Sequence, residues 1–153
     1  MPAASNSPRR DPYLAFCFRV NIQGAGLTDA TGLFKSVSGL SFETEVVDFK
    51  EGGVNDMTHK LLGGTKFKNI VLKRGFSGNE FADWWKQWQA PSGKPGRVMG
   101  TIEQLDTKGA VKAAWQFVGG WPCKYEVSEF DASKNEVTIE TLEIAHQGLT
   151  KTK

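Results

Sequence analysis

Apolar and polar residues alternate along residues 136–145, EVTIETLEIA, which is the pattern of a β-strand. The alternation changes parity halfway, because Val137 and Ile139 are odd-numbered whereas Leu142 and Ile144 are even-numbered. Successive side chains of a strand point to opposite faces, so the two halves offer apolar residues to opposite sides. Two explanations are open: a β-bulge that swaps the faces, or a second face that a neighbouring copy of the chain covers.

The same periodicity predicts strands along most of the chain, most clearly at residues 14–23. A second parity slip follows Val46, where the apolar positions change from even to odd numbers. The turn segment DTKG predicts a hairpin between the strands on either side of it, and Pro122 must lie at a strand start or on a sheet edge. The other predicted strands lie at 33–50, 57–75, 97–105, 110–118 and 119–130.

One segment has a helical period instead. Ser77 and Glu80 have the spacing of a capping box, and Pro91 and Gly93 end the pattern. Between them, apolar residues recur at i, i+3, i+4 and i+7, and we expect this stripe to face the sheet core rather than a ligand or a membrane. The stripe consists of Phe81, Trp84, Trp85 and Trp88.

These elements predict a mainly β fold: an antiparallel β-barrel or sandwich of seven or eight strands with one short flanking α-helix. At 153 residues the chain fits a single domain with its own core. We expect an N-terminal arm at 1–11, the barrel at 12–149 and a C-terminal tail at 150–153.

Charge and targeting signals narrow the class of protein. The chain has 19 basic and 17 acidic residues, a net charge of +2, and this balance argues against nucleic acid as a primary ligand. Because the arginines near the N-terminus precede no apolar run, we expect synthesis and assembly in the cytoplasm without a signal peptide. Cys17 and Cys123 lie far apart in apolar segments, which favours two reduced thiols.

Reactive residues do not converge in the sequence. His59 and His146 have no metal-motif spacing, and Asp29 replaces the third glycine of a dinucleotide loop after Gly24. Ser77 fits a helix cap better than a nucleophile. We therefore expect no enzyme, no catalytic residue, no cofactor and no metal.

Five segments, in this order and spacing, are similar to one known family. They are LFKSVSGLSFETEVVDFKEGG, HKLLGGTKFKNIVLKRG, FADWWKQW, WPCKYE and NEVTIETLEIAHQGL. The chain resembles the T4-type tail tube proteins of contractile phages and phage-like contractile injection systems, from about Pro12 to Leu149.

The resemblance implies six-membered rings that stack into a hollow tube inside a contractile sheath and are propelled through a target envelope. It implies as partners other copies of the chain, a sheath protein, and baseplate and tube-initiator proteins, with cargo in the lumen and no membrane anchor. It also implies inner-sheet strands that join between subunits, and neighbour contacts by the segment from Glu45 to Leu62. The candidate interface residues are Val46, Val47, Phe49, Val54, Met57, Leu61, Leu62, Leu142 and Ile144.

A conduit wall should be polar, with few apolar patches. The candidate wall residues mix both signs, which favours protein cargo or an empty tube over DNA. A phage tail and an injection system both stay open, as does release or retention of the particle. The alternative from another class is a monomeric β-barrel that binds a small apolar ligand. The candidate lumen residues are Glu43, Glu45, Lys66, Lys68, Glu103, Lys112, Thr138 and Glu140.

Overall fold

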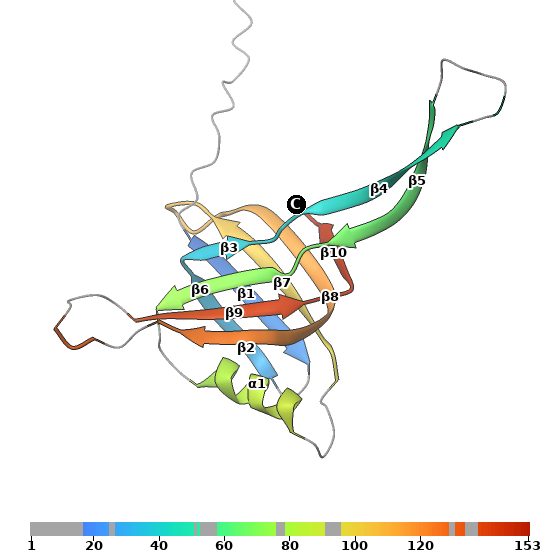
Figure 1. Ribbon diagram of the computed structural model, residues 1–153. Helices are drawn as coiled ribbons and strands as arrows, with labels where there is room; N and C mark the ends of the chain where they lie inside the picture. Colours follow the sequence, from blue (N-terminus) through green and yellow to red (C-terminus); the bar gives the residue numbers. More distant parts are fainter. Residues whose placement is uncertain are drawn as a thin grey trace, which may run out of the picture.

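A computed structural model describes residues 17–24, 27–50, 52, 58–75, 79–90, 96–128, 131–133 and 138–153. These residues form ten strands and one helix, and every strand pair is antiparallel (Figure 1). The mainly β fold with a single short helix is therefore confirmed. The elements are β1 Cys17–Gly24, β2 Leu27–Phe34, β3 Ser36–Ser38, β4 Phe42–Lys50, β5 Thr58–Phe67, β6 Ile70–Gly75, α1 Glu80–Gln89, β7 Val98–Leu105, β8 Val111–Val127, β9 Ile139–Ala145 and β10 Gly148–Lys151.

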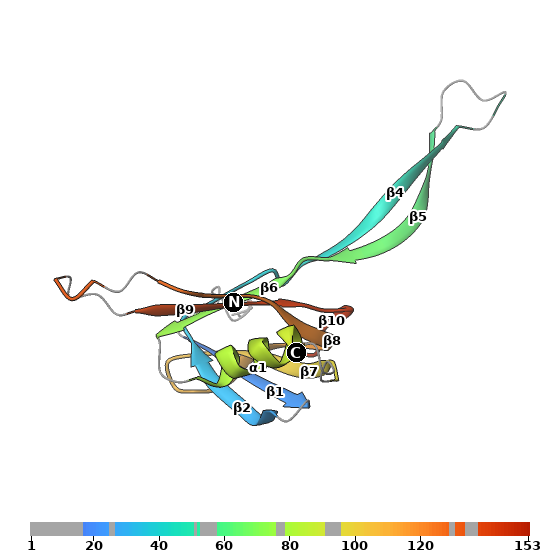
Figure 2. The same cartoon turned by 60° about the horizontal axis from the view of Figure 1, so that its bottom comes forward.

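The body of the molecule is one folded-over sheet with the strand order β2-β1-β7-β8-β9-β6-β3, and β10 adds to β8. Its two halves face each other across the core, and α1 lies along the side where it contacts β8 and β2 (Figure 2). The remaining strands, β4 and β5, pair with each other and project from the body as a hairpin.

Strand β8 belongs to both halves of the sheet. Its first part pairs with β7 and β10, and its second part pairs with β9. The bend lies at Gly119, whose φ of +65° is in the left-handed region that favours glycine. The prediction of two separate strands, 110–118 and 119–130, was therefore wrong, because Gly119 and Gly120 bend the chain without interrupting the strand.

The predicted hairpin around DTKG is confirmed. Asp106 Oδ1 accepts hydrogen bonds of 2.9 Å from the backbone N–H groups of Lys108 and Ala110, and Gly109 takes a φ of +80°. The bond from Ala110 is the main reason that the pKa of Asp106 lies below its usual value. The side chain thus replaces part of the backbone hydrogen bonding in the turn.

Val137, where the parity change of the segment 136–145 begins, lies outside the described residues. Strand β9 keeps a regular register with β6, and its even-numbered side faces the core throughout. Glu140, Leu142 and Ile144 are all buried on that side. The prediction that Leu142 and Ile144 contact a neighbour was wrong, because both lie in the core of their own subunit.

A charged side chain occupies a core position in β9 because its partners are also buried. Arg74 Nε donates a hydrogen bond of 2.8 Å to Glu140 Oε2, and Tyr125 Oη donates one of 2.7 Å to Glu140 Oε1. Arg74 is 8% exposed and Glu140 is 1% exposed. A buried ion pair needs such additional hydrogen bonds to offset its loss of hydration.

The same arginine connects the sheet to the helix. Arg74 Nη2 donates a hydrogen bond of 3.2 Å to Glu80 Oε2 at the start of α1, and the guanidinium lies 4.3 Å from the ring centroid of Phe81. The predicted capping box is wrong, since Asn79 stands at the N-cap and Glu80 is bonded to the sheet. Ser77 lies outside the described residues.

The apolar stripe of α1 faces the core, as the sequence predicted. Phe81 and Trp84 are each 1% exposed, while Trp88 is partly buried and its ring lies 5.8 Å from that of Trp121. Trp85 is only half-buried. The helix therefore closes the side of the sheet mainly through its first two aromatic residues.

Replacing Trp84 with alanine should lower the free energy of unfolding by roughly 3 to 5 kcal/mol, the usual cost of removing a buried large aromatic. Trp85→Ala should cost less because that side chain is only half-buried. Urea unfolding followed by circular dichroism measures both variants. Equal costs for the two variants would contradict the core role of Trp84.

Alkaline pH should reveal the hydrogen bond of Tyr125. Burial, reinforced by Glu140, raises the pKa of Tyr125 to about 12 from its ordinary 10.0. The unfolded phenol ionises first, so this contribution to stability is complete below pH 10 and is lost as the pH rises toward 12. The free energy of unfolding should be measured for the native protein and for Tyr125→Phe at about pH 9 and at about pH 11. The difference between the two proteins should be smaller at the higher pH, and an equal difference at both pH values would contradict the assignment.

Candidate assembly surfaces

The β4–β5 hairpin has no core of its own. Its strands pair from Phe42 with Phe67 at the base to Lys50 with Thr58 near the tip, and within the described residues each strand pairs only with the other. Figure 2 shows the hairpin projecting away from the body, so its outer part does not pack against the sheets. A two-stranded ribbon with both faces in water is only marginally stable by itself.

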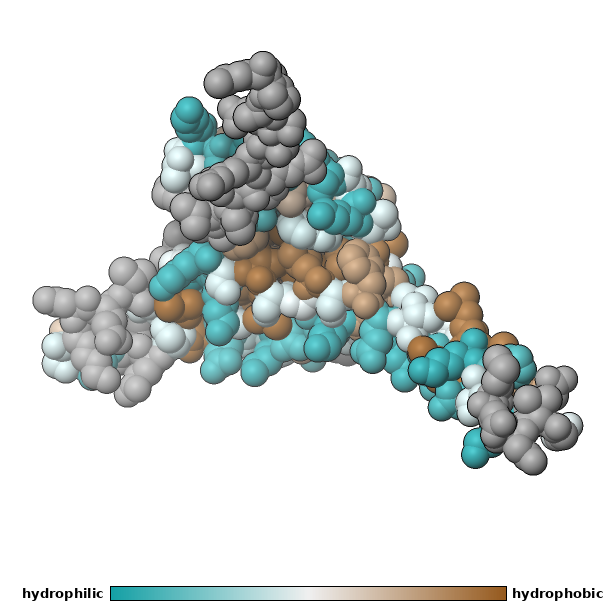
Figure 3. Space-filling view, turned by 90° about the horizontal axis from the view of Figure 1, so that it is seen from above, coloured by the Kyte–Doolittle hydropathy of each residue, from teal (hydrophilic) through white to brown (hydrophobic). Residues whose placement is uncertain are grey.

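Both faces of this hairpin carry exposed apolar residues. Val46 lies opposite Leu62 on one face, and Val47 lies opposite Leu61 on the other, where Phe49 follows. Leu62 is 88% exposed, and the other four are between 46% and 58% exposed. Figure 3 shows hydrophobic and hydrophilic residues mixed along the projecting arm. Apolar side chains on both faces of an unpacked ribbon indicate that another molecule covers it.

The second parity slip arises from this two-sided character, and a bulge lies nearby in the partner strand β5. The register shifts between Thr44 and Val46, where Glu45 stands opposite Gly63 and Gly64. A Cβ atom on Gly63 would lie 2.7 Å from the carbonyl oxygen of Glu45, so only glycine fits there. Strand β4 itself alternates normally, so the successive residues Val46 and Val47 point to opposite faces, and both faces are therefore apolar.

The interface residues expected from the sequence thus fall into three groups. The hairpin brings five of them together in the open, and Leu142 and Ile144 belong to the core. Val54 and Met57 lie outside the described residues. The five exposed residues are Val46, Val47, Phe49, Leu61 and Leu62.

The expected lumen residues do not share one face. Glu43, Glu45 and Lys66 lie on the hairpin, where Lys66 Nζ is 3.7 Å from Glu45 Oε2, and Lys68 follows at its base. Glu140 was wrongly assigned, since it is buried and hydrogen-bonded in the interior.

The other expected lumen residues lie elsewhere on the body. Arg19 Nε donates a hydrogen bond of 3.1 Å to Glu103, and Lys112 Nζ lies 3.6 Å from Asp106 Oδ2 beside the β7–β8 turn. Thr138 directly precedes β9. These residues lie on different parts of one chain, and only an assembly of several copies could bring them together around a lumen. Their place on a lumen wall therefore stays a prediction.

Reactive chemistry is sparse in the part of the chain that the structure describes. It contains no group of three or more histidine, cysteine or carboxylate side chains placed to hold a metal ion. Cys123 Sγ donates a hydrogen bond of 3.4 Å to the carbonyl of Glu143, and burial raises the pKa of this thiol. The one helix in those residues is too short to cross a membrane.

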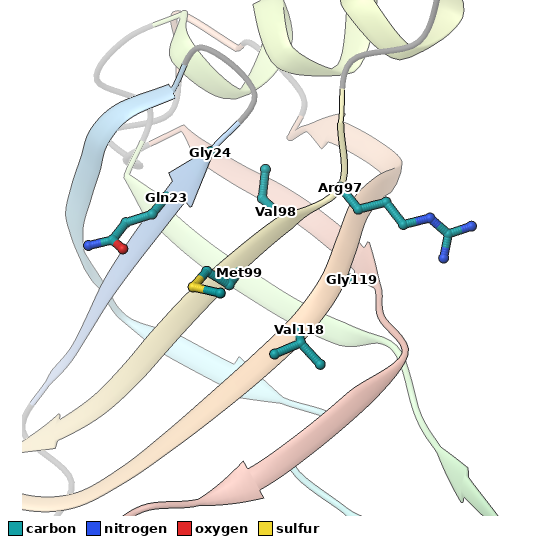
Figure 4. Close-up of a pocket in the computed structure, with 7 residues that line it drawn as sticks. All are labelled: Gln23, Gly24, Arg97, Val98, Met99, Val118 and Gly119. Carbon is teal, nitrogen blue, oxygen red and sulfur yellow. The ribbon is translucent and has the colours of Figure 1, made fainter.

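A recess of about 360 Å³ on the body was not anticipated from the sequence. Met99 of β7 and Val118 of β8 line it and are 47% and 44% exposed (Figure 4). Its other lining residues are Gln23, Gly24, Arg97, Val98 and Gly119. Met99 and Val118 become neighbours only through strand pairing, so no local sequence pattern indicates this recess.

Residues 14–150 match the family described as T4-like virus tail tube protein gp19. The chain belongs to this tail tube family. As a member of the family it is a structural tube protein, and the resemblance found in the sequence is confirmed. A comparison with curated protein sequences finds no match.

Solved structures share the fold of this tail tube family member. A chain of the anti-feeding prophage baseplate, described as six-fold symmetrised, has a TM-score of 0.78 at 23% identity, covering 92% of this chain and 95% of that one. A chain of the extended PVC sheath-tube complex, an extracellular contractile injection system, has a TM-score of 0.78 at 21% identity, covering 94% and 93%. A type six secretion system protein is more distant, with a TM-score of 0.61 at 12% identity, covering 90% and 83%.

Proposed function

We propose that six copies of this chain form a ring, that rings stack into the inner tube of a contractile particle, and that the tube is propelled through a target envelope. The partners are then further copies of the chain, a sheath protein, and baseplate and initiator proteins. The particle is a phage tail or an injection system, and the subunit has no enzymatic role. The observation that carries this proposal is the hairpin with two exposed apolar faces.

The apolar surface of the hairpin favours a permanent assembly over a monomer. Full burial of a Val, Leu or Phe side chain is worth about 1.5 to 3 kcal/mol, and the hairpin offers six such residues when Phe42 at its base is included. A monomeric protein would leave all six exposed to water, where they favour aggregation. A tube in which each copy covers the hairpin of another removes this surface.

Open strand edges support ring formation. Strand β2 pairs only with β1, and β10 pairs only with β8, among the strands that the structure describes. Unpaired edge strands present rows of free N–H and C=O groups, which proteins cover or pair. Edge pairing between adjacent subunits around a ring would satisfy these groups at every junction, because a closed ring has no ends.

The comparisons favour these particular partners. The similar chain of the anti-feeding prophage comes from a six-fold symmetrised baseplate, and the similar PVC chain comes from a complex of sheath and tube. Mixed charges on the exposed polar positions favour protein cargo or an empty lumen over DNA, because a DNA conduit should repel phosphate uniformly.

The packing of the interior argues against a small-ligand barrel. Phe34, Trp84 and Phe117, each at most 2% exposed, belong to the core cluster. Protein cores of this kind are packed closely, with few voids larger than a water molecule. The recess beside Met99 opens on the surface instead.

Replacing both Phe49 and Leu62 with aspartate should abolish tube formation and leave the subunit folded, because both side chains are exposed in the isolated chain. Exposed substitutions usually change the free energy of unfolding by less than about 0.5 kcal/mol. Electron microscopy shows the tubes, and urea unfolding checks the fold.

The matched control is Lys108→Asp, which introduces an acidic residue at an exposed turn far from the hairpin in sequence. The control should form tubes of ordinary length. Long tubes from the doubly substituted protein would show that the hairpin is not an assembly element.

A further inference from the structure

The direction in which the β4–β5 hairpin leaves the body is decided at its base. Among the described residues, Phe67 is the one hairpin residue that packs against the core cluster. The rest of the hairpin pairs with itself and projects away from the sheets (Figure 2). A projecting ribbon acts as a lever, so the few contacts near its base determine where its tip lies.

The chain enters the hairpin through a close backbone crossing. Gly39 has a φ of +86°, in the left-handed region, and a Cβ atom there would lie 2.0 Å from the carbonyl oxygen of Asn69. Leu40 follows and packs partly against the core, so the outgoing segment is attached before β4 starts. This crossing fixes where the hairpin begins, whereas its angle depends on the returning segment.

His146 holds the returning segment. Its Nε2 lies 2.9 Å from the carbonyl oxygen of Lys68, the residue directly after β5. A carbonyl oxygen only accepts hydrogen bonds, so Nε2 carries the hydrogen and donates it. The contact lies two residues beyond the last backbone pair of β6 and β9, Ile70 with Ile144. In Figure 1, β9 runs beside β6 toward the side of the body from which the hairpin leaves.

The imidazole ring also joins the hairpin base to the core by packing. Its centroid lies 5.6 Å from that of Phe67 and 6.3 Å from that of Phe117, which is fully buried. Aromatic rings attract each other at such separations. The other ring nitrogen, Nδ1, is shielded from solvent and has no hydrogen-bond partner among the described residues. One hydrogen bond, through Nε2, and two aromatic neighbours therefore orient the ring.

The turn that carries His146 is itself attached to β8. The N–H group of Gln147, the next residue, donates a hydrogen bond of 3.0 Å to the carbonyl of Val118. The Gln147 side chain covers Gly119, where a Cβ atom would lie 2.8 Å from Gln147 Oε1. Gly119 is the residue at which β8 bends. A turn fastened to this strand gives His146 a fixed position from which to hold Lys68.

A second side-chain contact lies at the same junction. Asn69 Nδ2 donates a hydrogen bond of 3.0 Å to Glu143 Oε1, but this bond is exposed to solvent. Water replaces an exposed hydrogen bond at little cost when one partner is removed. The contact made by His146 therefore has the larger effect on the hairpin.

We propose that His146 is a positioning residue whose Nε2–H bond to the Lys68 carbonyl sets the direction of the hairpin. The inference goes beyond the proposed function, because it concerns the single subunit and holds whatever molecule covers the hairpin. A segment that is already held in one direction loses less conformational freedom when another molecule binds it. Such positioning lowers the cost of covering the hairpin.

Nitrogen NMR of the imidazole tests the hydrogen bond directly. Spectra of the unassembled native subunit should show the hydrogen of His146 on Nε2. A ring with its hydrogen on Nδ1 and a bare Nε2 would overturn the proposal, because such a ring cannot donate to Lys68.

Distances between spin labels test the direction of the hairpin. Labels on noncanonical residues at Thr58, near the tip, and at Lys108, on the body, leave the native cysteines unmodified. His146→Phe keeps a ring without the donor, and the ratio of released to held hairpin should rise roughly two- to tenfold, the range that one hydrogen bond allows. His146→Gln keeps an N–H donor and should retain the native distance distribution.

Asn69→Ala is the matched control, because it removes the exposed hydrogen bond at the same junction. Its distance distribution should equal that of the native protein, and circular dichroism should show the same strand content in every variant. His146→Leu, which also lacks a donor, serves if His146→Phe does not fold.

Three results would each overturn the role of His146: a native distribution without the donor, equal release in Asn69→Ala, or no retention of the held hairpin in His146→Gln. All of these measurements use the unassembled subunit. A native protein that forms no tubes would therefore count against the proposed function and leave the role of His146 intact.

Discussion

The buried pair of Arg74 and Glu140 is the interaction on which the rest of the fold depends. It joins β6 to β9, and through Tyr125 and Glu80 it reaches β8 and α1. Removing one partner of such a pair costs about 3 to 5 kcal/mol because a buried charge is left uncompensated. A charge network that requires four elements at once also rejects alternative strand registers, since a shift by one residue would turn Glu140 outward and leave Arg74 alone in the core.

The apolar residues that the folded subunit leaves exposed on the hairpin are separate from those that form its core. The core between the sheets contains the large aromatic residues, and of the hairpin only Phe67 at its base packs against it among the described residues. Folding and assembly therefore use different residues of one chain. Mutation can change the contacts between copies without unfolding the subunit, which lets an interface adapt to a new partner at little cost in stability.

Regular periodicity made several features predictable from the sequence. The helix was predictable because four aromatic residues follow its period, and the β7–β8 hairpin because Asp106 and Gly109 have turn chemistry. The burial of Glu140 in β9 was not predictable from the sequence. A glutamate in an alternating strand is typical of a solvent-facing position unless its partner, here Arg74, is known. That partner is 66 residues away in the sequence.

The candidate interface residues also divide into those that the sequence predicted and those that it did not. Apolar residues on both faces of 42–50 indicated a contact with another molecule, and the structure places them on the projecting hairpin. Leu142 and Ile144 have an equally apolar pattern, yet they are buried, since burial depends on which strands pair. The recess could not be predicted, because it arises where the bend of β8 meets β7.

The continuity of β8 has a mechanical consequence. A tube driven through an envelope carries axial load, and that load must pass from one half of each subunit to the other. Hydrogen-bonded ladders loaded in this way can slide, because each hydrogen bond contributes only about 0.5 to 1.5 kcal/mol net. In this subunit one covalent strand of 17 residues runs through both halves. In the tube proposed above, force would cross the subunit along the backbone of β8, and the two halves would shear apart only if the whole strand were stripped from its neighbours.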